Sequence, residues 1–99
     1  MIPGATPTHT FKVPMDTDII TALRITYKQG NNIVLQKELK DCTLLAGEIE
    51  CKLSQKDTLA FSDSGMVLVQ LKIRTTGNDV LVSKIKTVPV QSVLDKEVI

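Results

Sequence analysis

Apolar and polar residues alternate along several short segments of the chain, and each such run predicts a strand with one buried face. The clearest run is residues 21–29, where Leu23, Ile25 and Tyr27 alternate with polar or charged side chains. Residues 66–75 alternate in the same way. Shorter runs of this kind cover residues 8–13, residues 33–39 and the two arms of a hairpin around Ala46-Gly47.

The residues between these runs predict hairpin turns and set the strand registers. A three-residue loop at Gly30-Asn31-Asn32 places Tyr27 opposite Leu35, Ile25 opposite Lys37 and Leu23 opposite Leu39. A two-residue loop at Ala46-Gly47 pairs Cys42 with Cys51 and Leu44 with Ile49 on the core face. The second register leaves polar side chains on the solvated face, as a sheet with one buried side requires; they are Thr43, Glu48, Glu50 and Lys52.

A third hairpin is predicted after the strand at residues 66–75, whose inner face is Val67, Val69, Leu71 and Ile73. A three-residue loop at Gly77-Asn78-Asp79 would set Leu71 opposite Ile85 and Val69 opposite Thr87. This register leaves Lys84 and Lys86 in solvent, whereas a two-residue loop would bury them.

Two short helical turns are expected between the strands. One precedes Ile20 and is capped by Asp16 or Thr17. The other begins at Ser54, which forms a capping box with Asp57. Leu59 and Phe61 would pin this second turn to the core, and Asp63-Ser64-Gly65 would end it.

These elements predict one domain, residues 1–99, with an N-terminal arm at residues 1–7 and a C-terminal tail at residues 89–99. The expected fold class is all-β: an antiparallel two-sheet β-sandwich, immunoglobulin-like, of 6–7 strands with one or two short helical turns. The tail carries too many apolar residues to remain free in water. We expect it to pack on the domain or on a partner.

Charge and composition argue against some classes of function and location. Twelve basic and eleven acidic residues give a net charge of +1, which argues against nucleic acid or an anionic membrane as a partner. The N-terminus lacks the features of a signal peptide, and no apolar run reaches the roughly 20 residues of a membrane-spanning helix. The expected place of synthesis and folding is therefore the cytosol.

The residues that could carry chemistry predict no catalytic, cofactor-binding or metal site. His9 is the only histidine, so a Ser-His-Asp triad or a histidine-based metal site is not expected. The aspartates fit turns, where Asp caps helices and tolerates left-handed backbone. They are Asp16, Asp18, Asp41, Asp57, Asp63 and Asp79.

Cys42 and Cys51 are the one reactive pair that the hairpin register brings together. As directly opposed residues they are close enough for a disulfide, although a cytosolic origin and an apolar core face favour reduced thiols. Both alternatives stay open at this point. Lys72, Arg74, Lys84 and Lys86 would gather on one outer face, which is either a contact for anions or a solvated face that discourages edge pairing.

Four stretches of the chain together resemble one group of proteins. They are Thr6-Pro7-Thr8-His9-Thr10-Phe11 with Val13-Pro14-Met15-Asp16-Thr17, residues 23–29, residues 53–61, and residues 69–75 leading to Ser83. The sequence resembles small proteins encoded in the tail-gene region of phages and prophages of Gram-positive bacteria. It is also distantly similar to the N-terminal β-sandwich modules of phage baseplate upper proteins, which dock receptor-binding parts onto the tail.

The resemblance implies a non-enzymatic structural or assembly protein of the phage tail or baseplate, located in the virion. Its expected partners are other phage structural proteins or further copies of itself in a homo-oligomer, and its expected contacts are the arm, the edge strands and the tail. The alternative is a small ligand-binding or carbohydrate-binding β-sandwich module. That function needs a platform of exposed aromatic rings, and the chain has only Phe11, Tyr27 and Phe61 to form one.

Overall fold

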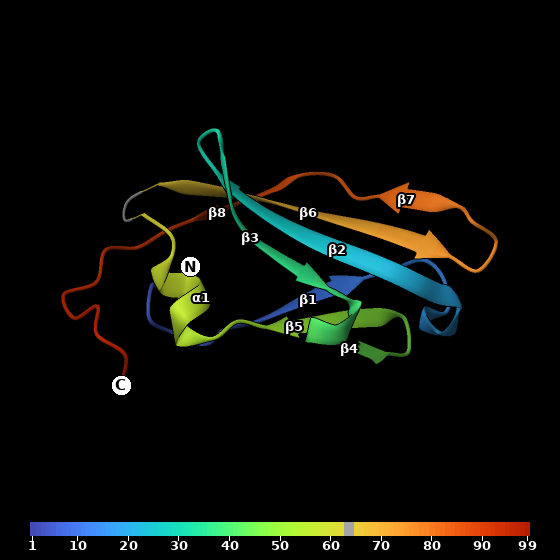
Figure 1. Ribbon diagram of the computed structural model, residues 1–99, viewed down its shortest axis with the longest axis horizontal. Coiled ribbons are helices and arrows are strands. Elements are labelled where there is room, and N and C mark those ends of the chain that lie inside the picture. Colours follow the sequence, from blue (N-terminus) through green and yellow to red (C-terminus); the bar gives the residue numbers. More distant parts are fainter. Residues whose placement is uncertain (63–64) are drawn as a thin grey trace.

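The structure is a computed structural model, and it describes residues 1–62 and 65–99. The described chain is mostly β, with eight strands in two antiparallel sheets (Figure 1). The first sheet has the strand order β1-β5-β4. In the second sheet the order is β3-β2-β6, and both β7 and β8 pair with the far edge of β6. The strands are β1 (Thr8–Lys12), β2 (Ile20–Gln29), β3 (Asn32–Glu38), β4 (Cys42–Leu45), β5 (Glu48–Lys52), β6 (Met66–Thr75), β7 (Val80–Val82) and β8 (Lys86–Pro89).

Three short helical turns join these strands: η1 (Thr17–Ile19), η2 (Leu39–Asp41) and α1 (Gln55–Leu59). The expected counts of 6–7 strands and one or two turns were therefore too low. The additional strand arises because the last predicted strand is divided into β7 and β8, and the additional turn is η2. At η1, Asp16 occupies the N-cap position, but its side chain accepts no capping hydrogen bond, contrary to expectation.

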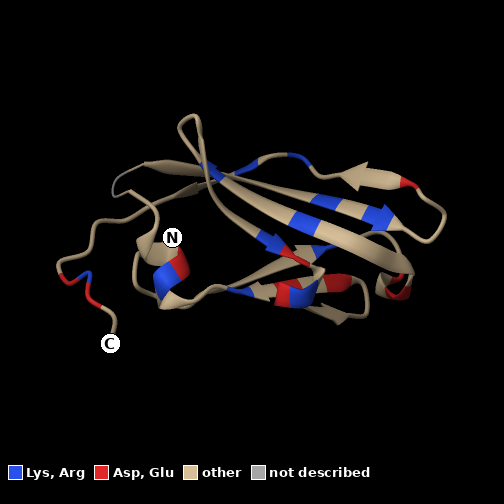
Figure 2. Ribbon diagram, in the orientation of Figure 1, with Lys and Arg blue, Asp and Glu red and all other residues tan. Residues whose placement is uncertain are grey.

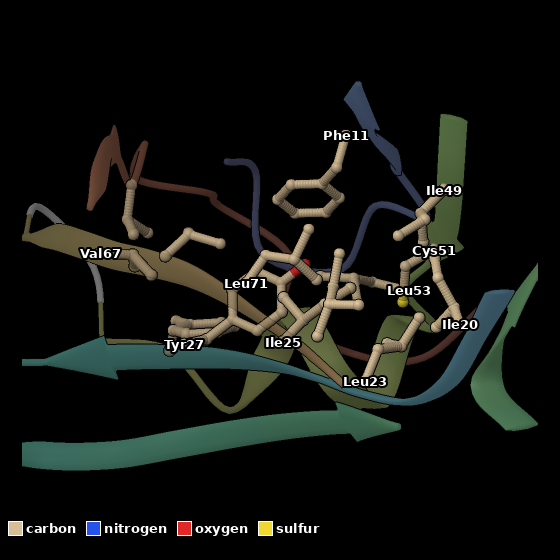
Figure 3. Packing of buried hydrophobic residues seen from close by; sticks show 14 residues of the cluster. Phe11, Ile20, Leu23, Ile25, Tyr27, Ile49, Cys51, Leu53, Val67 and Leu71 are labelled. Atoms are coloured by element: carbon tan, nitrogen blue, oxygen red, sulfur yellow. The ribbon is translucent and has the colours of Figure 1, made fainter. Parts of the chain in front are cut away.

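The core lies between the inner faces of the two sheets (Figure 3). The predicted inner residues of β2 and β6 are all buried, which confirms both alternation patterns. The first sheet and the segment after it contribute Phe11, Ile49, Cys51 and Leu53 to the same cluster. Burial of apolar surface from two facing sheets is the main stabilising contribution in such an arrangement.

The β2–β3 hairpin has the predicted register in its central part: Tyr27 lies opposite Leu35 and Ile25 opposite Lys37. Its ends differ from the expectation. Asn32 already belongs to β3, and a bulge at Val34 shifts the pairing so that Lys28 lies opposite Ile33. The chain then enters η2, so the predicted pairing of Leu23 with Leu39 does not form.

The β4–β5 hairpin agrees with the sequence throughout. Cys42 lies opposite Cys51 and Leu44 opposite Ile49, with a two-residue connection at Ala46-Gly47. Gly47 has φ +69°, a left-handed conformation that glycine adopts without steric cost.

The register predicted after β6 is wrong. The loop closes between Thr75 and Asp79, with Asn78 at φ +62°, and Ile73 lies opposite Leu81. The Ser83 hydroxyl accepts a hydrogen bond from the Leu71 N–H at 2.9 Å, in the place of a strand carbonyl. The loop itself lies one residue earlier than predicted, which moves the β7 register by two residues and places Ile73 opposite Leu81. The Ser83 contact then separates β7 from β8 and moves the register back by one residue, so Val69 faces Lys86 rather than Thr87.

The α1 turn forms through the predicted capping box: the Ser54 hydroxyl accepts from the Asp57 N–H at 3.1 Å, and the Asp57 carboxylate accepts from the Ser54 N–H at 2.9 Å. Phe61 packs in the core. The expected end of this turn at Asp63-Ser64-Gly65 falls partly outside the described residues, since Asp63 and Ser64 are not described.

The N-terminal arm packs against α1 through the buried Thr58. The Thr58 hydroxyl accepts from the Gly4 N–H and donates to the Ala5 carbonyl, each at 2.9 Å. The Gln91 N–H donates to the Met1 carbonyl at 2.9 Å, so the arm also contacts the tail. Most of the arm is therefore part of the packed domain, and Ile2 is its one exposed large apolar side chain.

Candidate functional site

The residues with reactive side chains lie in a polar seam between the sheets, which we define as His9, Tyr27, Lys37, Cys42, Cys51 and Asp57. The Tyr27 hydroxyl lies 2.7 Å from His9 Nδ1, and the rings are 5.6 Å apart. Burial lowers the pKa of His9 and raises the pKa of Tyr27. A neutral imidazole and a protonated phenol therefore share this hydrogen bond, a contact that activates neither group. Sequence reasoning missed it because it joins β1 to β2 across the two sheets.

Cys42 and Cys51 are both free thiols in the structure. Burial, together with the neighbouring Cys51, raises the pKa of Cys42 to about 12, and burial also raises the pKa of Cys51. Only a thiolate is a good nucleophile or metal ligand. At neutral pH this pair therefore behaves as two small core side chains, as the cross-strand register suggested.

Lys37 lies opposite the buried Ile25 and points toward the core side of its edge strand. Its ammonium forms an ion pair of 2.8 Å with Asp57, whose carboxylate also closes the α1 capping box. Burial acts to raise the pKa of Asp57, but the contacts with Lys37 and Ser54 outweigh it and the pKa is lowered. This ion pair joins β3 to α1, and no pattern in the sequence predicted it.

The seam does not form a metal centre: among the described residues, no group of three or more His, Cys, Asp and Glu side chains could hold a metal ion. Its members also lie apart from the two surface hollows described below. Two of its pairs, His9 with Tyr27 and Lys37 with Asp57, join elements that are not neighbours in the sequence.

Exposed apolar residues define a different candidate. All three residues of β7 are exposed, at 45% for Val80, 43% for Leu81 and 55% for Val82. Leu81 faces the core side, opposite the buried Ile73, but the three-stranded sheet does not cover it. The outer backbone groups of this edge strand have no partner strand in the structure. We call this strand and its unpaired backbone the β7 edge.

The other edge strands of the five-stranded sheet carry features that discourage pairing with another chain. In β3 these are the inward-pointing Lys37 and the bulge at Val34; in β8 they are Lys86 and Pro89. Lysine, proline and bulges at such positions are known to prevent edge-to-edge association. The β7 edge has none of these features within its own three residues.

The tail contributes a second group of exposed apolar side chains. Val90 is buried in the core, whereas Leu94, Val98 and Ile99 are exposed. Val98 lies beside a shallow hollow of about 840 Å³ between the α1 region and the tail. We expected the tail to pack on the domain or on a partner, and the buried Val90 shows that its first part packs on the domain.

Among the described residues, no helix is long and apolar enough to cross a membrane. The three aromatic rings lie in the core, at 9% exposure or less, and Tyr27 and Phe61 pack edge to face with centroids 6.0 Å apart. They cannot form a ring platform for a sugar without leaving the core. Comparison with models of protein families, with curated proteins and with solved structures found no match for this chain.

Proposed function

We propose that the protein is a non-enzymatic structural or assembly protein of a phage or prophage, acting through protein–protein contacts in the tail or baseplate. The observation that carries the proposal is the β7 edge, where three exposed apolar side chains accompany unpaired backbone groups. An exposed, apolar edge strand is a template for an additional strand from another chain. The resemblance of the four sequence stretches to tail-region proteins supplies the biological setting.

The proposed fold within that setting is an immunoglobulin-like β-sandwich. Two antiparallel sheets that share one core are compatible with it. The proposed location is the virion, and the proposed partners are other phage structural proteins or further copies of this chain. The alternative, a carbohydrate-binding module, is disfavoured by the burial of Phe11, Tyr27 and Phe61.

The proposal is tested by following the protein through particle production. In its bacterial host, with particle formation induced, we expect mass spectrometry to find the chain in purified particles or in tail-assembly intermediates. The substitution Leu81→Lys should remove it from both, because it puts a charge on the β7 edge. Thr10→Lys, on the exposed face of β1, is the matched control and should leave incorporation unchanged. Absence of the wild-type chain from both fractions would overturn the proposal.

A further inference from the structure

Four cations gather on the outer face of the five-stranded sheet, in an open groove of about 500 Å³. We call it the basic groove; its cations are Arg24, Lys40, Lys72 and Arg74. Figure 2 shows the basic bands of β2 and β6 side by side on this sheet. The groove joins residues of β2, β3, η2, β6 and β7, so no single hairpin of the sequence reveals it. Lys84 and Lys86, which the sequence placed beside Lys72 and Arg74, do not line it.

The strand register places like charges together in this groove. Arg24 lies directly opposite Lys72, and Arg74 is the next outward-facing residue of β6. Like charges directly opposed across two strands destabilise a sheet. Lysine and arginine on an edge strand discourage aggregation, but β2 and β6 are interior strands with a neighbour on each side. Edge protection therefore does not explain these cations.

Glu38 is the one carboxylate that lines the groove among the described residues, against four cations. It lies opposite Arg24 in the ladder, but the two form no ion pair, and its side chain accepts the Asp41 N–H in the η2 capping box. Three of the cations thus stand close together on interior strands, with Lys40 of η2 beside them, and none of the four forms an ion pair with a described residue. Such an arrangement is a preformed site for an anionic group, in which the repulsion between cations is relieved by the ligand.

We infer that the basic groove binds an extended acidic segment of a partner protein; this rests on the proposed function and specifies the chemistry of the partner. Apolar side chains of Leu39 and Val80 line the groove beside the cations, and the small Ala22 opposite Arg74 leaves room between them. Val80 also belongs to the β7 edge. A partner strand paired with β7 would lie on the far side of Val80 from Arg74, two strand spacings or about 10 Å from β6. Its outward-facing glutamate side chains would reach toward Arg74 across Val80.

A protein segment fits the groove better than a nucleic acid does. The whole chain has a net charge of only +1, and Glu38 lies in the groove itself. Nucleic acid presents a continuous row of phosphates and is bound by long basic surfaces. A short groove that mixes four cations with apolar walls matches a peptide in which acidic and apolar residues alternate.

The test measures binding of a labelled ten-residue peptide of alternating glutamate and valine, with blocked ends, by fluorescence anisotropy on the full chain. We expect saturable binding that weakens about tenfold between 50 and 300 mM salt, because exposed charge pairs are screened. The double variant Lys72→Gln with Arg74→Gln should weaken binding at least tenfold. Lys84→Gln with Lys86→Gln changes the net charge equally and should bind as the wild type does.

Thermal unfolding of the same variants separates a binding role from a structural one. Removing opposed like charges should raise the Tm of the Lys72→Gln, Arg74→Gln variant by about 1–5 °C, so stability and binding change in opposite directions. A fall in both quantities would assign the cations a structural role and overturn the inference.

Three further outcomes would also overturn the inference. The glutamate peptide shows no saturable binding, or a peptide with glutamine in place of glutamate binds equally well. The third is that a single-stranded oligonucleotide binds more tightly than the glutamate peptide and loses this binding in the Lys72→Gln, Arg74→Gln variant. The last would make the groove a nucleic-acid site. The test is independent of the particle experiment. Peptide binding by a chain that is absent from particles refutes the proposed function alone, and incorporation into particles without peptide binding refutes the groove alone.

Discussion

The two edges of the five-stranded sheet differ in the surroundings of their inward-facing side chains. At the β3 edge, Lys37 points toward the core side and is held by Asp57 of the α1 region at 2.8 Å. At the β7 edge, Leu81 occupies an equivalent inward position opposite Ile73, but it is 43% exposed. Both edges have unpaired outer backbone among the described residues; the β3 edge carries an inward charge held within the chain, whereas all three side chains of the β7 edge are apolar and exposed.

This difference follows from the unequal size of the two sheets. The three-stranded sheet covers β2 and much of β6, but it does not extend over β7, where the inward side chain remains exposed. Stability should therefore depend on residues near β2, and contacts with other chains should depend on residues of β7. The predictions below test that separation.

The largest expected effect is the contrast between two inward-facing apolar residues. Ile25→Ala removes a fully buried side chain and should lower the free energy of unfolding by about 2–5 kcal/mol. Leu81→Ala, at the half-exposed β7 edge, should lower it by less than about 1 kcal/mol. Urea unfolding measures both. Equal losses would mean that β7 belongs to the stabilising core and that the two edges do not differ.

The arm contact beside α1 should come next in magnitude. Thr58→Val keeps the shape of a buried side chain but leaves the Gly4 N–H and the Ala5 carbonyl without their partner. We expect a loss of about 1–3 kcal/mol in urea unfolding. Thr58→Ser retains the hydroxyl and should keep most of that stability, and Thr43→Val on the exposed face of β4 should change it by no more than about 0.5 kcal/mol. A Thr58→Val protein as stable as the wild type would show that the arm is not held through this hydroxyl.

The sequence predicted some parts of the fold and not others. Inner faces and the β4–β5 register followed from alternation and turn residues, because both are local properties of the chain. The register after β6 was wrong because the turn closes between Thr75 and Asp79, one residue earlier than predicted, and because the Ser83 hydroxyl then replaces a backbone acceptor for Leu71. A side-chain hydrogen bond of this kind leaves no trace in the apolar pattern.

The candidate sites were harder to predict, because they depend on pairings between distant segments. Arg24 meets Lys72 only through the β2–β6 ladder, and Lys37 meets Asp57 only when α1 packs beside β3. Hairpin reasoning concerns neighbouring strands, so it grouped Lys72 with Lys84 instead. The exposure of the β7 residues could not be predicted either, because it depends on how far the three-stranded sheet extends over the five-stranded sheet.

The β3 edge can be converted into a second open edge. The experiment starts from the Leu81→Lys variant, in which a charge protects the β7 edge. In that variant, Lys37→Val removes the inward charge from β3. The second substitution should change the free energy of unfolding by at most about 1 kcal/mol. Self-association should nevertheless increase, seen as a concentration-dependent rise in sedimentation coefficient. Lys28→Val removes the same charge from an interior strand and is the control. If both variants sediment alike, Lys37 does not protect the β3 edge.

The smallest effect expected is a pH dependence that belongs to the seam and not to the β7 edge. Burial lowers the pKa of His9 below its ordinary value of 6.5, so the folded state binds fewer protons than the unfolded state between these two values. The resulting stability is fully present above pH 6.5 and is lost as the pH falls through the folded pKa. The urea midpoint should therefore decrease from pH 7.5 to pH 5.5 in the wild type and in Leu81→Lys, but change little in His9→Gln. As the only histidine, His9 can be titrated directly by NMR. A measured pKa above 6.5 would reverse the sign of this pH dependence and contradict a neutral imidazole hydrogen-bonded to the Tyr27 hydroxyl.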